Sequence, residues 1–347
     1  MASLFVHIMK NISIHHLGSN LSMTKDIIIR RLVPEDAPAL TALIRRCYGE
    51  TYGPSVFYDT VSLTEMISKR KLCSVVAENG LQIVGHMGLT VRHSESIVCE
   101  TGNTVVDKNV RGQGLLLKLG MALHDLVLQA KYVGYVHYPT TAHHIMQRAS
   151  VAYGGKETGV MLAYVSETTD PELASKRSLA ATVVYQPISP VPKREVVLPA
   201  KYHAVIERLY KKLNLDRMVI SAPQSLYKNL TIDDAPIDAD YCSKRGVLHL
   251  FTKKTTSNMT ENVSALIEKY QPKITHIDLP LDNADIDSIV DSLNDIGFLF
   301  CALLPEFAHT DLLRLQAITS LAPDDLALNL INEDAISLGE FICQSVC

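Results

Sequence analysis

The chain has 347 residues and a formal net charge of −4, with 47% hydrophobic and 20% charged residues. This balance is typical of a folded globular protein and excludes a disordered chain. The charge balance and the lack of a long Lys/Arg run argue against a nucleic-acid partner, because neutralising phosphates requires a basic face. No apolar run has the length of a membrane-spanning helix, so we also expect no membrane partner.

The cysteine and histidine patterns bear on redox chemistry and metals. Seven cysteines are scattered without CxxC spacing, which argues against a disulfide framework or a zinc site and suits a reducing, cytoplasmic location. Thirteen histidines lack the paired spacing beside carboxylates that metal sites use, so we expect no metal.

The length suits two domains of ordinary size. Residues 1–24 are interpreted as a flexible N-terminal extension. A proline-rich stretch at 187–192 is the most plausible linker, which divides the rest into units at 25–186 and 187–347.

Hydrophobic periodicity and turn residues predict the elements of both units. The first unit is predicted to contain, in order, a strand at 27–33, a helix from 34, a helix at 60–69, a hairpin of 72–77 and 83–89 around Asn79-Gly80, a strand at 97–106, a helix at 115–128, a strand at 132–138, a helix at 141–153 and a strand at 158–165. The second is predicted to contain a helix at 201–212, a strand at 246–252, a helix at 259–270, a strand at 274–279, a helix at 284–293, strands at 298–304 and 311–318, and a helical tail.

The junction between the strand at 97–106 and the helix at 115–128 is the most informative stretch. Gly112 and Gly114 let the backbone close on an anion, and Arg111 adds a fixed positive charge. A helix that begins here directs unpaired N–H groups and its dipole at one point. The turn therefore predicts a site for the pyrophosphate of a cofactor, although a helix capped by a plain glycine loop is the alternative.

In this order of elements, the first unit resembles the GCN5-related N-acetyltransferase (GNAT) superfamily. The resemblance rests on the hairpin Leu72–Leu89, the strand Glu100–Val106 and the run Arg111-Gly112-Gln113-Gly114, with further similarity at 141–148 and 153–159. The family signature is Arg/Gln-x-x-Gly-x-Gly/Ala, and Leu116 replaces its last small residue. The resemblance implies an α/β fold with a mixed α+β sheet, the acyl-CoA N-acyltransferase fold.

The second unit shares part of this resemblance. The segments His276–Pro280 and Ile296–Phe298 look like the final third of the same fold, and no glycine-rich turn accompanies them. We therefore expect a tandem arrangement with a smaller, degenerate GNAT-like C-terminal domain. This domain can complete the acceptor pocket or provide the surface of a homodimer.

The resemblance implies acetyl-CoA, or another acyl-coenzyme A, as co-substrate. Its pyrophosphate would lie on the backbone of Arg111, Gly112, Gln113, Gly114, Leu115 and Leu116. Its pantetheine would follow the strand that ends at Val105 and Val106, near Thr141, and the N–H groups of these two valines would hold the acyl oxygen.

Glu100 is the candidate base, because strand alternation places it with Gly102 and Thr104 on one face and a carboxylate can take the proton of an amine through water. A solvated strand glutamate is the alternative. The tyrosine that protonates the departing thiolate in many relatives would fall at Ser150 or Val151. Tyr153 is nearby but out of phase, so protonation is assigned either to Tyr153 or to water.

Five further residues are candidates for acceptor binding: Tyr52, Phe57, Tyr58, His143 and Gln147. The three aromatics surround a Gly-Pro break, which suits a mobile pocket wall or, equally, a hydrophobic plug. His143 and Gln147 share a helix face, and packing on the sheet edge is the alternative for the histidine.

These inferences predict an acyl-CoA-dependent N-acyltransferase that acts by direct attack of a primary amine, carried by a small molecule or a peptide. The alternative is a coenzyme A-binding regulatory or interaction module with little or no catalysis. Leu116, the missing tyrosine and the degenerate second unit favour this alternative modestly.

Overall fold

The computed structural model describes residues 27–50, 52, 54–92, 96–142, 144–166, 178–221, 237–243, 245–253, 258–308, 310–319, 326 and 328–345. The predicted extension at 1–24 and the candidate residue His143 lie outside these described residues.

The first part of the chain forms the strands and helices predicted for it, and one further strand, β7. The bounds are β1 (Ile28–Arg31), α2 (Ala37–Tyr48), η2 (Ser55–Tyr58), α3 (Thr60–Ser68), β2 (Leu72–Asn79), β3 (Gln82–Thr90), β4 (Val98–Val106), η3 (Lys108–Val110), α4 (Leu115–Gln129), β5 (Gly134–His137), α5 (His144–Ala152), β6 (Lys156–Ser166) and β7 (Ser178–Pro187). Asn79 pairs with Gln82, so the hairpin turn consists of Gly80 and Leu81, one residue later than predicted.

The second part contains all the elements predicted for it and three short strands that the pattern does not predict, β8 to β10. The bounds are β8 (Arg194–Val196), α6 (His203–Leu213), β9 (Arg217–Val219), β10 (Asp238–Cys242), β11 (Val247–Phe251), α7 (Met259–Tyr270), β12 (Ile274–Pro280), α8 (Ile286–Asp295), β13 (Leu299–Leu304), β14 (Leu312–Ile318) and α9 (Glu333–Gln344).

One mixed sheet runs through both parts. Its 12 strands follow the order β1-β2-β3-β4-β5-β7-β6-β13-β14-β12-β11-β10. The pairs β4–β5 and β11–β12 are parallel, whereas the other neighbours in this sheet are antiparallel. The mixed α/β class inferred from the sequence is therefore the class that the structure has.

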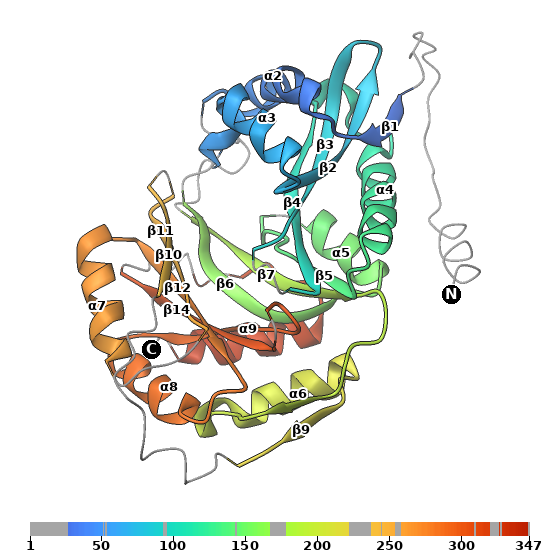
Figure 1. Ribbon diagram of the computed structural model, residues 1–347. Coiled ribbons are helices and arrows are strands. Elements are labelled where there is room, and N and C mark those ends of the chain that lie inside the picture. Colours follow the sequence, from blue (N-terminus) through green and yellow to red (C-terminus); the bar gives the residue numbers. More distant parts are fainter. Residues whose placement is uncertain are drawn as a thin grey trace.

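The sheet curves strongly enough to bring distant strands together (Figure 1). The Arg92 Nη1 atom, just beyond β3, lies 3.9 Å from the Asp240 Oδ2 atom on β10, the last strand of the sheet. Curvature therefore places first-unit and second-unit residues around one concave face.

Helices cover the sheet on both sides of the first unit. Four residues at helical spacing bury one face of α4 against β2 and β3: Leu115, Leu119, Leu123 and Val127. Helices α2 and α3 lie on the opposite face (Figure 1). They pack there against Val76, Ile83 and Val105. Within the described ranges, no helix is long and apolar enough to cross a membrane.

Two sets of four strands share one topology. The sets β4-β5-β7-β6 and β11-β12-β14-β13 have the same order, and each begins with a parallel pair joined by a helix, α4 or α7. Antiparallel pairs follow in both sets. The two sets are joined through β6 and β13. Across this junction the strands of the second set follow in the reverse of the order that they have in the first. This repetition supports the predicted tandem arrangement, which stays a prediction.

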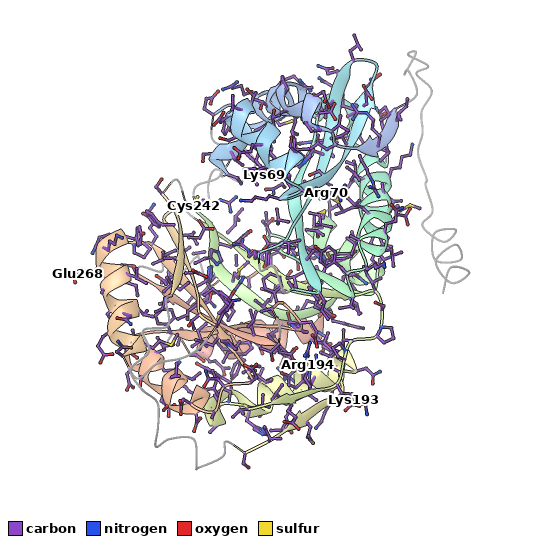
Figure 2. All side chains as sticks on the ribbon, viewed as in Figure 1. Lys69, Arg70, Lys193, Arg194, Cys242 and Glu268 are labelled. Atoms are coloured by element: carbon purple, nitrogen blue, oxygen red, sulfur yellow. The ribbon has the colours of Figure 1, made fainter. Side chains whose placement is uncertain are left out.

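A buried ionic cluster attaches the small parallel sheet of β8 and β9 to the loop between β13 and β14. Arg217 donates to Asp311 at 2.6 and 3.0 Å and to Glu306 at 2.9 Å. Arg194, labelled in Figure 2, donates to Glu306 at 2.7 Å. The side chains of Arg217, Glu306 and Asp311 are at most 1% exposed, so these charges depend on one another.

We expect Arg217→Met to lower the free energy of unfolding by about 3–5 kcal/mol, because it leaves buried carboxylates without their main partner. Urea unfolding measures this change. Lys193→Met is the matched control: Lys193 pairs with Asp216 at the surface, with side chains 85% and 64% exposed, so we expect no measurable effect. Equal losses in both variants would contradict a special role for the buried cluster.

Candidate functional site

The glycine turn has the backbone that the sequence predicts for it. Gly112 and Gly114 have φ angles of 78° and 70°, in the left-handed region that favours glycine. Residues 111–114 are exposed, whereas Val110 and Leu115 on either side are buried and anchor the turn. The Lys118 N–H donates to the Gly114 carbonyl, so the N–H groups of the first turn of α4 point away from the helix.

Hydrogen bonds and one ion pair fix the position of this turn at the end of β4. The Arg111 Nε atom donates to the Val106 carbonyl at 3.3 Å, so its guanidinium lies beside the strand. Asp107 accepts from the Asn109 N–H at 3.1 Å and from Arg46 at 3.0 Å. The turn therefore presents a positive charge and a helix N-terminus side by side.

Strand β4 has an open edge that leads to the turn. It pairs with β5 only from Val98 to Glu100, opposite Gly134 to Val136, although it continues to Val106. Beyond Glu100 the two strands therefore separate on this side. Backbone N–H and C=O groups along such an edge can bind an extended chain that carries amides.

A β-bulge shapes this open part of β4. The register with β3 shifts between the pairs Gly88–Gly102 and His86–Val105, and Asn103 has a φ angle of 51°. The His86 Nδ1 atom lies 2.7 Å from the Asn103 carbonyl oxygen, which accepts a hydrogen bond from it. Burial lowers the pKa of His86 to about 4, so this donor is a neutral imidazole.

His86 is completely buried. Its ring also contacts Phe57 edge-on, with 5.7 Å between centroids. The positioning role at the bulge could not be inferred from the sequence, because it depends on a neighbouring strand.

The segment that carries the candidate aromatic residues Tyr52, Phe57 and Tyr58 lies against the bulge. The Tyr52 hydroxyl donates to the Asn103 side chain at 3.3 Å, and the Tyr52 N–H donates to the Tyr58 hydroxyl at 2.7 Å. Phe57 is 1% exposed and packs edge-on against Tyr52. Tyr52 thus borders the site, whereas Phe57 supports it from the core; their contact with an acceptor stays a prediction.

Glu100 lies on the concave face, where its carboxylate forms an ion pair with Arg92. The Arg92 Nε and Nη2 atoms donate to its carboxylate at 2.6 and 3.3 Å, and the Tyr138 hydroxyl donates at 3.3 Å. Burial favours a higher pKa for Glu100, but the charge and hydrogen bonds of Arg92 and the charge of Arg314 outweigh it. The pKa is lowered, so Glu100 is a carboxylate at neutral pH, and a weaker base than an isolated one.

Helix α5 and the segment before it lie beside β7 and close the site on another side. Both the N–H and the hydroxyl of Thr141 donate to the Ala180 carbonyl, at 2.8 and 3.2 Å. Gln147 is buried and donates to the Asn329 carbonyl at 2.9 Å. The predicted contacts of Thr141 with pantetheine and of Gln147 with the acceptor stay predictions.

Ser150 is one of the two positions at which the resemblance would place a tyrosine, and its hydroxyl is hydrogen-bonded. It donates to the Met146 carbonyl at 2.7 Å and lies 2.6 Å from the His137 Nε2 atom, whose N–H it accepts. The Ser150 hydroxyl proton therefore forms a hydrogen bond within its own helix.

Tyr153 lines a hollow of about 100 Å³ between α4, β5 and the end of α5. The other lining residues are Gly120, Met121, His124, Asp125 and Tyr135. Burial raises the pKa of Tyr153, so its hydroxyl carries a proton at neutral pH. Its assignment as the proton donor to a thiolate stays a prediction.

Three ionisable residues on β12 and β14 of the second unit are not predicted from the sequence as site residues: His276, Asp278 and Arg314. Arg314 lies 3.4 Å from the Tyr138 hydroxyl through Nη1 and holds Asp278 through two hydrogen bonds. The available signal was the occurrence of ionisable residues within otherwise apolar strands. No group of three or more His, Cys, Asp or Glu residues in the described part of the chain could hold a metal ion.

A comparison of the sequence with protein-family models finds no match, and a comparison with curated proteins finds none. Solved structures do match, and the three below are acetyltransferases, the first and the third of the GNAT family. One, from Streptococcus pneumoniae, is 15% identical, with a TM-score of 0.41 over 47% of this chain and 100% of that chain. A putative acetyltransferase from Salmonella typhimurium, solved with acetyl-CoA, is 16% identical, with a TM-score of 0.41 over 48% of this chain and 96% of that chain.

A phosphinothricin acetyltransferase of the same superfamily from Sinorhizobium meliloti, in complex with acetyl-CoA, is 16% identical. The match covers 48% of this chain and 90% of that chain, with a TM-score of 0.39. All three matches span about half of this chain, so the tandem second unit is not tested by them.

We expect His86→Phe to lower the free energy of unfolding by about 1–3 kcal/mol, because the Asn103 carbonyl loses its buried donor. Urea unfolding measures this change. Ser74→Ala is the matched control, since the Ser74 hydroxyl is buried on the adjacent strand and has no hydrogen-bond partner within the described residues. Equal stability of His86→Phe and the unsubstituted protein would contradict a role for His86 in holding the bulge.

Proposed function

We propose that this chain is an acyl-CoA-dependent N-acyltransferase that transfers an acetyl group from acetyl-CoA to a primary amine. The observation that carries the proposal is the open edge of β4 beyond Glu100, which leads directly into the glycine turn before α4. Coenzyme A contains a pyrophosphate joined to a chain with two amides. A turn that can bind a pyrophosphate, next to a strand edge that can bind amides, matches this chemistry.

The residues present fit this co-substrate. The N–H groups from Arg111 to Leu116 would bind the pyrophosphate, with the Arg111 guanidinium beside them. The open edge of β4 would bind the pantetheine amides, and the N–H groups near Val105 and Val106 would receive the acyl oxygen. When bound, acetyl-CoA supplies an acyl group activated as a thioester.

Glu100 would act on the acceptor. Its carboxylate lies on the concave face, beside the point where β4 and β5 separate. Arg92 keeps it ionised, so it can hold an ammonium group and take its proton through water. A carboxylate has about four lone-pair sites, so the bonds from Arg92 and Tyr138 leave room for an amine.

Two observations favour the alternative of a coenzyme A-binding module without catalysis. The ion pair with Arg92 makes Glu100 a weaker base, and the Ser150 hydroxyl is committed to Met146. Release of free thiol from acetyl-CoA with a broad panel of amines separates the two functions. Saturable binding of acetyl-CoA without thiol release in the whole panel would favour the module.

Gly114→Val tests the turn. The left-handed φ of Gly114 strains any β-branched residue, and the altered turn would no longer present its N–H groups together, so we expect the Kd of acetyl-CoA to rise about ten-fold or more. Isothermal titration measures it. Gly297→Val is the matched control: Gly297 has a φ of 94° and open space around it, but lies between α8 and β13. Equal affinity of the two variants for acetyl-CoA would contradict a pyrophosphate site at this turn.

Substitutions at Glu100 and Arg92 test the base. We expect Glu100→Gln to lower kcat strongly with the Kd of acetyl-CoA nearly unchanged. Arg92 lowers the pKa of Glu100, and the reactive form is the carboxylate. Arg92→Met should therefore move the acid limb of the kcat/KM profile to higher pH. An unmoved acid limb, or full turnover in Glu100→Gln, would remove Glu100 as the base.

A further inference from the structure

Ionisable residues from both units meet on the concave face of the sheet. Arg92, Glu100 and Tyr138 come from the first unit, and His276, Asp278 and Arg314 from the second. We call these six residues the inter-unit cluster. In Figure 2, Cys242 at the end of β10 and Lys69 and Arg70 at the end of α3 mark the two sides of the concave region.

The strand register places the second-unit members in one patch. Asp278 pairs with Arg314, and His276, two residues before Asp278 on β12, pairs with Gln316. His249 on β11 lies opposite His276, with ring centroids 4.8 Å apart. Residues two apart on a strand share a face, so the whole set faces the same way.

Exposure falls from the rim of the cluster to its floor. The Arg92 side chain is 33% exposed and that of Glu100 14%, whereas that of Arg314 is 1% exposed and His276 as a residue 0%. The polar groups therefore continue inward from the candidate base, into a region where unpaired polar atoms cost most.

Arg314 retains donor capacity toward Glu100. Its Nε and Nη2 atoms hold Asp278 at 2.6 and 2.7 Å. Among the described residues, its Nη1 atom makes only long contacts, 3.4 Å to the Tyr138 hydroxyl and 3.7 Å to the Met161 sulfur. A carboxylate oxygen at normal hydrogen-bond distance would bind this nitrogen better than either partner does.

His276 provides a second, independent indication of a ligand. It is completely buried, and neither ring nitrogen has a hydrogen-bond partner within the described residues. Buried polar atoms are normally satisfied, so two orphaned nitrogens on one ring point to a bound polar molecule. Burial lowers the pKa of His276, and the charges of Arg314 and Arg92 lower it further, so the surroundings of this ring favour an anion over a cation.

We propose that the inter-unit cluster binds the acceptor, and that the acceptor is a free amino acid: a small molecule whose primary amine lies a few bonds from a carboxylate. This inference rests on the proposed acyl transfer. The ammonium lies at Glu100, and the carboxylate lies at the Arg314 Nη1 atom and His276. The Tyr138 hydroxyl touches both Glu100, at 3.3 Å, and Arg314, at 3.4 Å, so the two subsites are one hydroxyl apart.

The groups named account for the bonds and protons of the transfer. The amine nitrogen forms a bond to the acyl carbon, and the carbon–sulfur bond of the thioester breaks. One proton of the ammonium passes to Glu100 and then to solvent, and a second leaves with the thiol. The second unit takes no part in this exchange; it positions the carboxylate of the acceptor.

The first experiment compares the twenty free amino acids with their carboxamides, alongside spermidine and a short peptide, in a thiol-release assay with acetyl-CoA. We expect at least one free amino acid to exceed its own amide about ten-fold or more in kcat/KM, because only the acid offers Arg314 a charged acceptor. Amides, spermidine or the peptide reacting as well as every free amino acid would overturn the proposal.

The second experiment uses His276→Phe, which keeps a ring beside His249 and removes both nitrogens. We expect the KM of the preferred amino acid to rise about ten-fold, with the Kd of acetyl-CoA unchanged. His203→Phe on α6, where the side chain is 43% exposed, is the matched control with no expected effect. An unchanged acceptor KM in His276→Phe, with the fold intact by circular dichroism, would overturn the role of His276.

The two proposals fail in different ways. If the protein does not bind acetyl-CoA, the proposed function fails and the acceptor inference falls with it. If acetyl-CoA binds and amines without a carboxylate are acylated equally well, the proposed function stands and only the inference about amino acids is wrong.

Discussion

Gly159 of β6 lies opposite Ala302 of β13, so close that a Cβ on the glycine would stand 2.2 Å from the Cys301 carbonyl oxygen. Beside this contact, the Gln316 side chain accepts from the Leu162 N–H at 3.0 Å and donates to the Val160 carbonyl at 3.1 Å. A side-chain amide thus supplies the bonds that a neighbouring strand would make. This junction joins the two units into one sheet, and it sets where Arg314 lies relative to Tyr138 and Glu100.

The curved sheet separates two tasks. The glycine turn and the hollow beside Tyr153 lie with α4 and α5, whereas Glu100 and the inter-unit cluster lie on the concave face. Strand β4 serves both: its open edge faces the point where β5 departs, and its bulge is held by His86. A thioester bound along this edge would meet an amine from the concave face without either ligand crossing the sheet.

Local patterns predicted most of the fold, because helices with a buried stripe and strands beside glycine turns carry their own signals. Strand β7 was missed because its residues from Ala180 to Gln186 are all buried, so the sequence lacks alternation. The glycine turn was also predictable, because its two glycines and the apolar pattern of the helix that follows are neighbours in the sequence. The ion pair of Glu100 with Arg92 joins side chains eight positions apart beside the β3–β4 pairing, and no local sequence pattern marks it. The approach of Arg314 to Tyr138 depends on the curvature of the sheet, which brings together residues 176 positions apart.

Hydrogen–deuterium exchange of the full chain, with and without saturating acetyl-CoA, tests the central claim directly, because the proposed contacts are backbone N–H groups. We expect slower exchange in two segments, 101–106 along the open edge of β4 and 112–117 at the start of α4, with α7 and α8 unchanged. Unchanged exchange in both segments under conditions where acetyl-CoA is bound would contradict the account.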